Sequence, residues 1–214
     1  MRARFRSPRV CALAAAALIA LSTPLLAGDD GPSSKVIEGL NRSLLMVLKD
    51  AATLGYRGRY DRLTPIMNEA FDLDFMAEKA LGRRWEPLSE ADRARWVAVF
   101  REFTIANYAA NFDHFANQRF DLLGEEPSAN DTTLVRTRVI DPTRDSVDLT
   151  YRLHQVDGKW RVVDIYLKGT VSELALRRSD YTAVLERGGF EALLTTVRGK
   201  ISALAAGRVK RPAP

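Results

Sequence analysis

The sequence predicts a single α+β domain in which an antiparallel four-stranded sheet packs against N- and C-terminal helices. Apolar residues recur at three- and four-residue steps before residue 117 and after residue 169, and they alternate from residue 118 to residue 167. The 214 residues are 46% hydrophobic, which is enough for one well-filled core. Helices followed by strands and then by helices are typical of the α+β class.

The first 27 residues are expected to be a secretory signal peptide. An arginine-rich start, "MRARFRSPRV", runs into the apolar "VCALAAAALIALS", and small residues ending at Ala27 suit cleavage there. The apolar run from Val10 to Leu21 is shorter than the roughly 20 residues that span a bilayer, which disfavours an uncleaved anchor. We therefore expect residues 28–207 to form the domain and residues 208–214 to be a disordered basic tail.

The charge of the mature chain argues against a nucleic-acid partner. The formal net charge falls from +5 to +1 without the signal peptide, because that segment holds four arginines and no acid. A nucleic-acid-binding domain needs a basic surface. The one cysteine, Cys11, also lies in this segment, so neither a disulfide nor a thiolate metal site is expected in the mature domain.

The first helices are predicted between residues 35 and 85. A helix from Lys35 is interrupted between Gly55 and Gly58, and a second, residues 60–71, is expected to bend at Pro65 because proline removes a backbone donor. A short third helix, residues 72–85, closes near Gly82. The apolar stripe of the first helix contains Val36, Leu40, Leu44 and Val47.

The strongest helix prediction covers residues 88–116. Ser89 followed by Asp92 resembles a capping box ahead of an apolar run. Apolar residues occupy more than half of the helix circumference, so we expect neighbours to cover this helix on two sides.

Four strands follow, at residues 118–123, 132–140, 146–153 and 160–167. The segments between them, such as "GEEPSAND" and the Asp157-Gly158 turn, are typical of loops. In the third strand, Leu149 and Tyr151 share a face. The fourth strand is apolar on both sides and is expected to be covered on both.

Two helices, residues 170–188 and 190–207, close the chain on either side of Gly188-Gly189. Thr170 and Glu173 resemble a second capping box that starts the first of them, with Gly169 turning the backbone. A phosphate-binding loop is disfavoured here, because the several glycines and the following lysine of such a loop are missing.

Polar residues give little evidence of catalysis. Asp164 lies among aromatic residues and is either a general base with a raised pKa or, as we favour, the ion-pair partner of Arg177 or Arg178. His114 and His154 lack acidic residues at ligand spacing, so no metal site is expected. No nucleophile elbow is present, and neither a catalytic residue nor a cofactor is predicted.

The chain is rich in aromatic residues, with nine Phe, six Tyr and three Trp. Such an excess serves either a larger ordinary core or an internal cavity for an apolar ligand. Periodicity leaves both interpretations open.

Two stretches resemble the MlaC (toluene-tolerance) family of periplasmic lipid-binding proteins. They are "LGRRWEPLSEADRARWVAVFREFTIANYA" from Leu81 and "GKWRVVDIYLKGTVSELALRRSDYTAVLERGGFEALLTTV" from Gly158, and the similarity extends roughly from Val36 to Leu204. The corner "DIYLKGTVSELALRRSDY" is similar to the HpnM branch, which is linked to hopanoid biosynthesis.

The resemblance implies a periplasmic, non-catalytic lipid carrier. Its curved sheet and its helices would enclose an apolar cavity for the acyl chains of a phospholipid or for a hopanoid. The expected partners are an inner-membrane ABC transporter complex and an outer-membrane lipoprotein complex. The residues that we expect to line the cavity are Met46, Met76, Tyr108, Phe112, Leu149, Tyr151, Ile165 and Leu167.

Two other functions stay open. One is a cone-type isomerase or hydratase acting on an apolar ring substrate, with Asp164 as base and Tyr108 as electrophile. The other is a non-catalytic periplasmic scaffold for enzymes of hopanoid biosynthesis.

Overall fold

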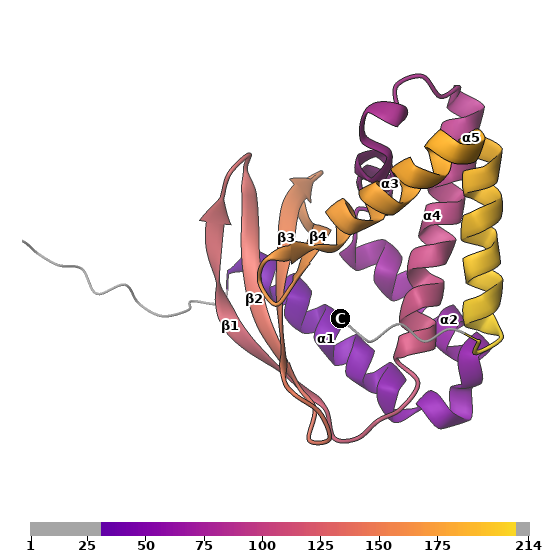
Figure 1. Cartoon of the computed structure of the whole chain (residues 1–214). Coiled ribbons are helices and arrows are strands. Elements are labelled where there is room, and N and C mark those ends of the chain that lie inside the picture. The colour runs from indigo at the N-terminus through magenta and orange to yellow at the C-terminus, as the bar shows by residue number, and fades with distance from the viewer. Residues whose placement is uncertain (1–30, 209–214) are drawn as a thin grey trace, which may run out of the picture.

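The computed structural model describes residues 31–208, which form a curved antiparallel sheet with most of the helices on one side of it (Figure 1). The predicted signal peptide and all but Arg208 of the predicted tail lie outside the described residues. The helices are α1 (Pro32–Lys49), α2 (Ala51–Ala70), α3 (Leu73–Leu81), the 3-10 helix η1 (Gly82–Arg84), α4 (Glu90–Asn111) and α5 (Glu173–Ala205). The strands are β1 (Arg119–Ser128), β2 (Thr132–Ile140), β3 (Val147–Val156), β4 (Lys159–Leu167) and β5 (Val171–Ser172).

Within residues 31–208 the sheet has five strands in sequence order, so the prediction of four strands is wrong by one. After Leu167 the chain reverses through Lys168 and Gly169, which both have positive φ (51° and 72°). This turn places Val171 opposite Leu167 and adds the two-residue strand β5 to the edge of the sheet. So short a strand leaves no alternating pattern in the sequence.

Strand β1 is longer than predicted, because "GEEPS" continues the strand instead of forming a loop. A bulge at Gly124, where φ is 119°, keeps the pairing with β2 as far as Ser128. The edge position explains the polar sequence, since charged residues and proline are common on edge strands. Glu125 of this segment accepts hydrogen bonds from Ser33 Oγ at 2.6 Å and from the Ser34 backbone N–H at 2.7 Å, which joins β1 to the start of α1.

The helices follow the predicted periodicity, with glycines at the points where the chain changes direction. Gly55 inside α2 has φ 58° and Gly189 inside α5 has φ 73°, so each of these two helices consists of two segments that meet at a kink. Helix α4 ends at Asn111, five residues before the predicted end at Ala116. Its side chains are buried almost all round over the second half of the helix, which confirms that neighbours cover it on two sides.

The helices α3, α4 and α5 meet in a filled core around Trp96. The indole is 0% exposed, and its Nε1–H donates a hydrogen bond of 2.9 Å to the carbonyl oxygen of Ala77. The ring of Tyr181 packs edge-on against it with 5.0 Å between centroids, and the ring of Phe100 lies 5.9 Å away. This region has the dense aromatic packing of an ordinary protein interior.

Strand β4 is covered on both faces, as predicted, because the four successive residues from Val162 to Ile165 are buried. The junction of α2 and α3 lies beside it, since the backbone N–H of Asp72 donates to the Val162 carbonyl oxygen at 2.9 Å. No helix within residues 31–208 is long and apolar enough to cross a membrane.

Candidate functional site

The sheet presents an apolar face to the helices at β3 and β4. Leu149 lies opposite Leu167, and Tyr151 lies opposite Ile165, in the antiparallel register of the two strands. Directly opposed residues of neighbouring strands point to the same face of a sheet. Alternation within the two strands therefore predicted this surface correctly.

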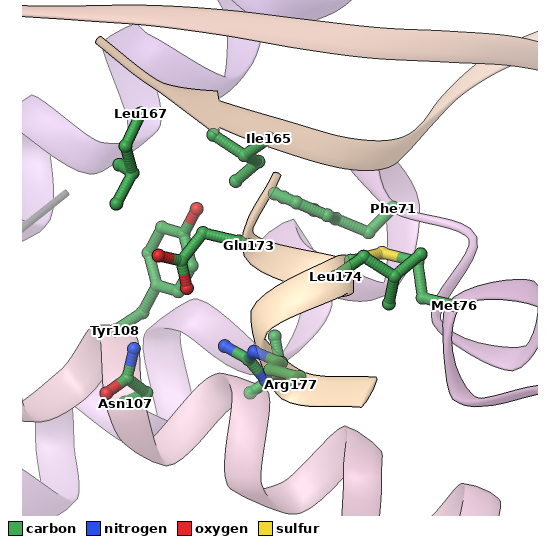
Figure 2. A pocket seen from close by; sticks show the side chains of 10 residues that line it. Phe71, Met76, Asn107, Tyr108, Ile165, Leu167, Glu173, Leu174 and Arg177 are labelled. Atoms are coloured by element: carbon green, nitrogen blue, oxygen red, sulfur yellow. Dashed lines mark hydrogen bonds between the residues drawn. The ribbon is translucent and has the colours of Figure 1, made fainter. Parts of the chain in front are cut away.

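Two cavities lie between this surface and the helices, one on each side of Tyr108. The first has a volume of about 50 Å³ and lies between β4, α4 and the first turns of α5 (Figure 2). Figure 2 shows Leu167 and Ile165 above it, Tyr108 beside it, and Phe71 and Met76 at its far end.

The second cavity has a volume of about 120 Å³ and lies beneath α1, at the end of α4, against β1, β2 and β3. It is apolar where α1 and the sheet meet, and polar where the loops after α4 and β2 close it. Its apolar lining consists of Leu44, Leu48, Tyr108, Phe112, Phe120, Val139, Leu149 and Tyr151.

Tyr108 separates the two cavities and lines both. Its ring stacks on that of Phe112 at 5.5 Å with an interplanar angle of 11°, and it meets the edge of Phe71 at 6.0 Å. Burial raises the pKa of Tyr108 well above its usual value, and burial likewise raises the pKa of Tyr151. Both phenols are therefore neutral at physiological pH.

Seven of the eight residues that the sequence suggested for a cavity lining are brought together around Tyr108. Met46 is the exception, since it is 58% exposed on the outer side of α1 and lines neither cavity. The other seven line one cavity or the other: Met76, Tyr108, Phe112, Leu149, Tyr151, Ile165 and Leu167.

The first cavity also contains a polar group that sequence reasoning did not assign to it. Arg177 is only 7% exposed, and its guanidinium lies over the rings of Phe100 and Phe103, 5.6 and 5.2 Å from their centroids. One Nη1–H donates to Thr104 Oγ1 at 3.2 Å. Figure 2 shows the guanidinium directed toward Asn107 at the cavity, with the carboxylate of Glu173 in front of Tyr108. A sequence signal existed, because Leu174, Arg177 and Tyr181 follow a helical stripe that is otherwise apolar.

Asp164 fixes the start of α5, although not through the predicted partners. Its Oδ1 accepts hydrogen bonds from the backbone N–H groups of Ile165 at 2.8 Å and Leu174 at 3.1 Å, and its Oδ2 accepts from Ser172 Oγ at 2.6 Å. The predicted ion pair with Arg177 or Arg178 is wrong, because neighbouring backbone donors already satisfy the carboxylate. The guanidinium of Arg178 instead donates to the Lys79 carbonyl oxygen at 2.7 Å.

The capping residue of α5 also differs from the prediction. Ser172, not Thr170, accepts the hydrogen bond from the Ala175 N–H, because pairing of Val171 with β4 delays the start of the helix to Glu173. The corner thus holds Glu173 and Arg177 at the first cavity.

The two histidines lie in different surroundings. Over the described part of the chain, no three His, Cys, Asp or Glu residues are grouped to hold a metal ion. His154 Nε2 lies 2.8 Å from Asp72 Oδ2, so this histidine is hydrogen-bonded as expected of a structural one. His114 follows the end of α4 and lines the second cavity.

The apolar side chains around Tyr108, where the sheet meets the helices, form what we call the seam. The fold and this seam define a small α+β domain whose sheet and helices leave room between them. The MlaC protein family matches residues 39–198, and the chain belongs to this family. The solved structure of a phospholipid-binding protein from Ralstonia solanacearum, in complex with a phospholipid, has the same fold with a TM-score of 0.72. That likeness covers 82% of this chain and 99% of the other at 19% sequence identity.

Proposed function

We propose that this protein is a periplasmic lipid carrier. It shelters the apolar part of a phospholipid between its sheet and its helices and shuttles it between an inner-membrane ABC transporter complex and an outer-membrane lipoprotein complex. Membership of the MlaC family supports this proposal, and so does the shared fold with a protein that was solved with a phospholipid bound.

The observation that carries the proposal is the pair of cavities on either side of Tyr108. Transfer of a methylene group from water to an apolar surrounding is favourable by about 0.8 kcal/mol, so a chain of several methylenes needs no other driving force. A cavity of roughly 150 Å³ holds a molecule the size of benzene, so these two smaller cavities, of about 50 and 120 Å³, each have room for only a few methylene groups. The bound chain displaces the stacked rings of Tyr108 and Phe112 and joins the two cavities.

Lipid extraction tests this function directly. Protein prepared without detergent is extracted with organic solvent, and the extract is analysed by mass spectrometry. We expect a phospholipid in a fixed ratio to protein. A hopanoid in the extract instead of a phospholipid would support the carrier function and assign this protein to the HpnM branch. Protein that neither retains lipid nor takes it up from vesicles would contradict the carrier function.

A matched pair of substitutions locates the binding site. Leu149→Trp places an indole in the second cavity and should reduce lipid uptake from vesicles at least about tenfold, since the chain loses much of its buried surface. Met46→Trp introduces the same indole on the exposed side of α1 and should leave uptake unchanged. Equal uptake by both variants would place the lipid elsewhere.

The two alternative functions, an isomerase or hydratase and a scaffold for hopanoid enzymes, make different predictions from the carrier. An isomerase would need Asp164 as a free base, but three donors already engage its two oxygens. A scaffold for hopanoid enzymes would contain no lipid and would instead co-purify with a protein.

A further inference from the structure

We propose that a groove between α4 and the second segment of α5 holds the second acyl chain of the bound phospholipid, and that Asn107 binds an ester carbonyl where the two chains diverge. This inference rests on the proposed function, because it assigns a part of the same ligand. The cavities beside Tyr108 have room for only a few methylene groups each. A lipid with two chains therefore needs another apolar surface that adjoins the first cavity.

The groove has a volume of about 430 Å³ and lies where α4 and the segment of α5 after Gly189 run side by side (Figure 1). Most of its lining is apolar, and it is open to water along the exposed Gly199. The apolar part consists of Phe103, Gly199, Ala203 and Leu204, and the rest consists of Asn107, Thr196 and Lys200. Such a surface shelters an acyl chain while the headgroup of the same lipid stays in water.

Gly199 keeps this groove open. A glycine inside a helix lowers stability relative to alanine, so it needs a reason such as a special backbone angle or a close neighbour. In the described part of the chain Gly199 has neither, because its φ is not positive and a Cβ at this position would meet no neighbouring element within 4 Å. The missing side chain leaves empty space beside the helix.

Asn107 lies where the groove adjoins the first cavity, since it lines both. This residue is only 8% exposed, and its Oδ1 accepts a hydrogen bond from Asn111 Nδ2 at 3.3 Å. Within residues 31–208 its Nδ2 donates no hydrogen bond, and Figure 2 shows this nitrogen on the side of the cavity. A buried donor without an acceptor is costly, so an acceptor on the ligand would bind favourably here.

The ester carbonyl that joins an acyl chain to glycerol is such an acceptor. With this carbonyl at Asn107, one chain enters the first cavity and continues past Tyr108. The other chain lies in the groove beside Gly199 and Leu204. The glycerol and the headgroup stay outside the first cavity, next to the open groove.

Uptake of diacyl and monoacyl lipids tests the groove. Lipid-stripped protein is incubated with vesicles of dioleoyl phosphatidylglycerol that contain a minor amount of the monooleoyl analogue. The protein is recovered by gel filtration, and its lipids are quantified by mass spectrometry. Wild-type protein should carry a single diacyl lipid. In Gly199→Trp, the ratio of diacyl to monoacyl lipid should fall at least about tenfold, as expected when roughly two methylene groups lose their shelter.

Gly39→Trp is the matched control. Gly39 also lies inside a helix beside open space, in a groove between α1, α2 and the turn after β3. Among the described residues, this groove shares no lining residue with either cavity. The substitution should therefore leave the ratio of the two lipids unchanged, and thermal melting verifies that both variants are folded.

A lipid without ester carbonyls tests the role of Asn107. Wild-type protein should take up dioleoyl phosphatidylglycerol in preference to its dialkyl ether analogue by about threefold or more, which is in the range of one hydrogen bond. Asn107→Leu removes the donor and keeps a side chain of similar size. In this variant the ratio of ester to ether lipid should be close to one.

The outcomes are distinct. An unchanged ratio of diacyl to monoacyl lipid in Gly199→Trp, or a second diacyl lipid bound to wild-type protein, would overturn the inference while the carrier function stands. Equal uptake of ester and ether lipid by wild-type protein would overturn the role of Asn107. If Gly199→Trp does not fold, this comparison, which needs no variant, still decides whether the chains diverge at Asn107. Uptake of none of the lipids would contradict the carrier function, and the inference with it.

Discussion

The core around Trp96 and the seam around Tyr108 are both rich in aromatic residues, yet the two cavities between sheet and helices are lined by Tyr108 and not by Trp96. Around Trp96, rings from α4 and α5 are in contact and the indole is fully buried. Around Tyr108, stacking with Phe112 occupies one side of the ring, and space remains toward β3 and β4.

The difference comes from which surfaces meet. Helices pack by fitting ridges into grooves, so α3, α4 and α5 approach closely. A twisted sheet curves away from a straight helix, and the gap between them must be filled by long side chains or by a ligand (Figure 1). Composition alone therefore does not separate a filled core from a lined cavity.

The largest effect is expected for a truncation in the filled core. Trp96→Ala removes a fully buried indole and its hydrogen bond to Ala77, and the helices around it cannot close the space. The free energy of unfolding should fall by about 3–5 kcal/mol, as measured by urea denaturation. Lipid uptake by the remaining folded protein should match that of the wild type. A loss below about 1 kcal/mol would show that this core is as loosely packed as the seam.

A second effect is expected at the turn between β4 and α5, which connects the seam around Tyr108 with the core around Trp96. Asp164→Ala leaves the Ser172 hydroxyl and the Leu174 N–H without their acceptor, which should cost about 2–3 kcal/mol of unfolding free energy. Asp164→Asn keeps one oxygen acceptor and should lose less than half of that. If the alanine variant is as stable as the wild type, Asp164 has no structural role, and a catalytic role would again need testing.

A smaller effect is expected inside the seam. Phe112→Ala removes a half-buried ring that already borders a cavity, so it should cost only about 1–2 kcal/mol. Because the ring no longer separates the two cavities, uptake of lipid from vesicles should be at least as fast as in the wild type. A stability loss as large as that of Trp96→Ala would remove the distinction between the two regions.

Periodicity predicted the elements that bury a continuous face. The buried positions of α4 and the shared face of Leu149 and Tyr151 both follow from repeat patterns. Periodicity failed where the structure of a segment depends on the strand that pairs with it or with the segment next to it. "GEEPS" forms a strand because β2 pairs with it, and Ser172 caps α5 because β5 pairs with β4. The sequence contains no local signal for either pairing.

The candidate site was predictable only in its apolar part. Alternation predicts that Ile165 and Leu167 share a face, and the structure agrees. Met46 lies off the buried stripe that contains Leu44 and Val47, so helix periodicity predicts its exposure and an adaptable side chain alone does not make it part of the lining. The predicted ion pair of Asp164 with Arg177 or Arg178 does not form, because a sequence does not show which side chains lie within hydrogen-bond distance. The volume of a cavity between the sheet and the helices also depends on the tertiary structure, so sequence periodicity does not predict it.

The smallest effect is expected where β1 meets α1, at the edge of the seam. Helix α1 has no side-chain cap of its own, and Glu125 supplies an acceptor for the Ser34 N–H at its first turn. Glu125→Gln should cost up to about 1 kcal/mol at pH 7, while Glu126→Gln, which removes the exposed neighbouring carboxylate, should cost less.

The pH dependence of this contact has a definite sign. Burial raises the pKa of Glu125, but the hydrogen bonds from Ser33 and Ser34 outweigh it, and the net result is a pKa below the usual value of 4.5. A carboxyl group with a lowered pKa in the folded state adds stability above its unfolded pKa, and this stability is lost as the pH falls through the folded pKa. The stability difference between wild type and Glu125→Gln should therefore be constant from pH 7 to about pH 5 and shrink below pH 4.5 in urea titrations. A difference that persists unchanged to about pH 3 would show that the charge of Glu125 does not join the sheet to α1.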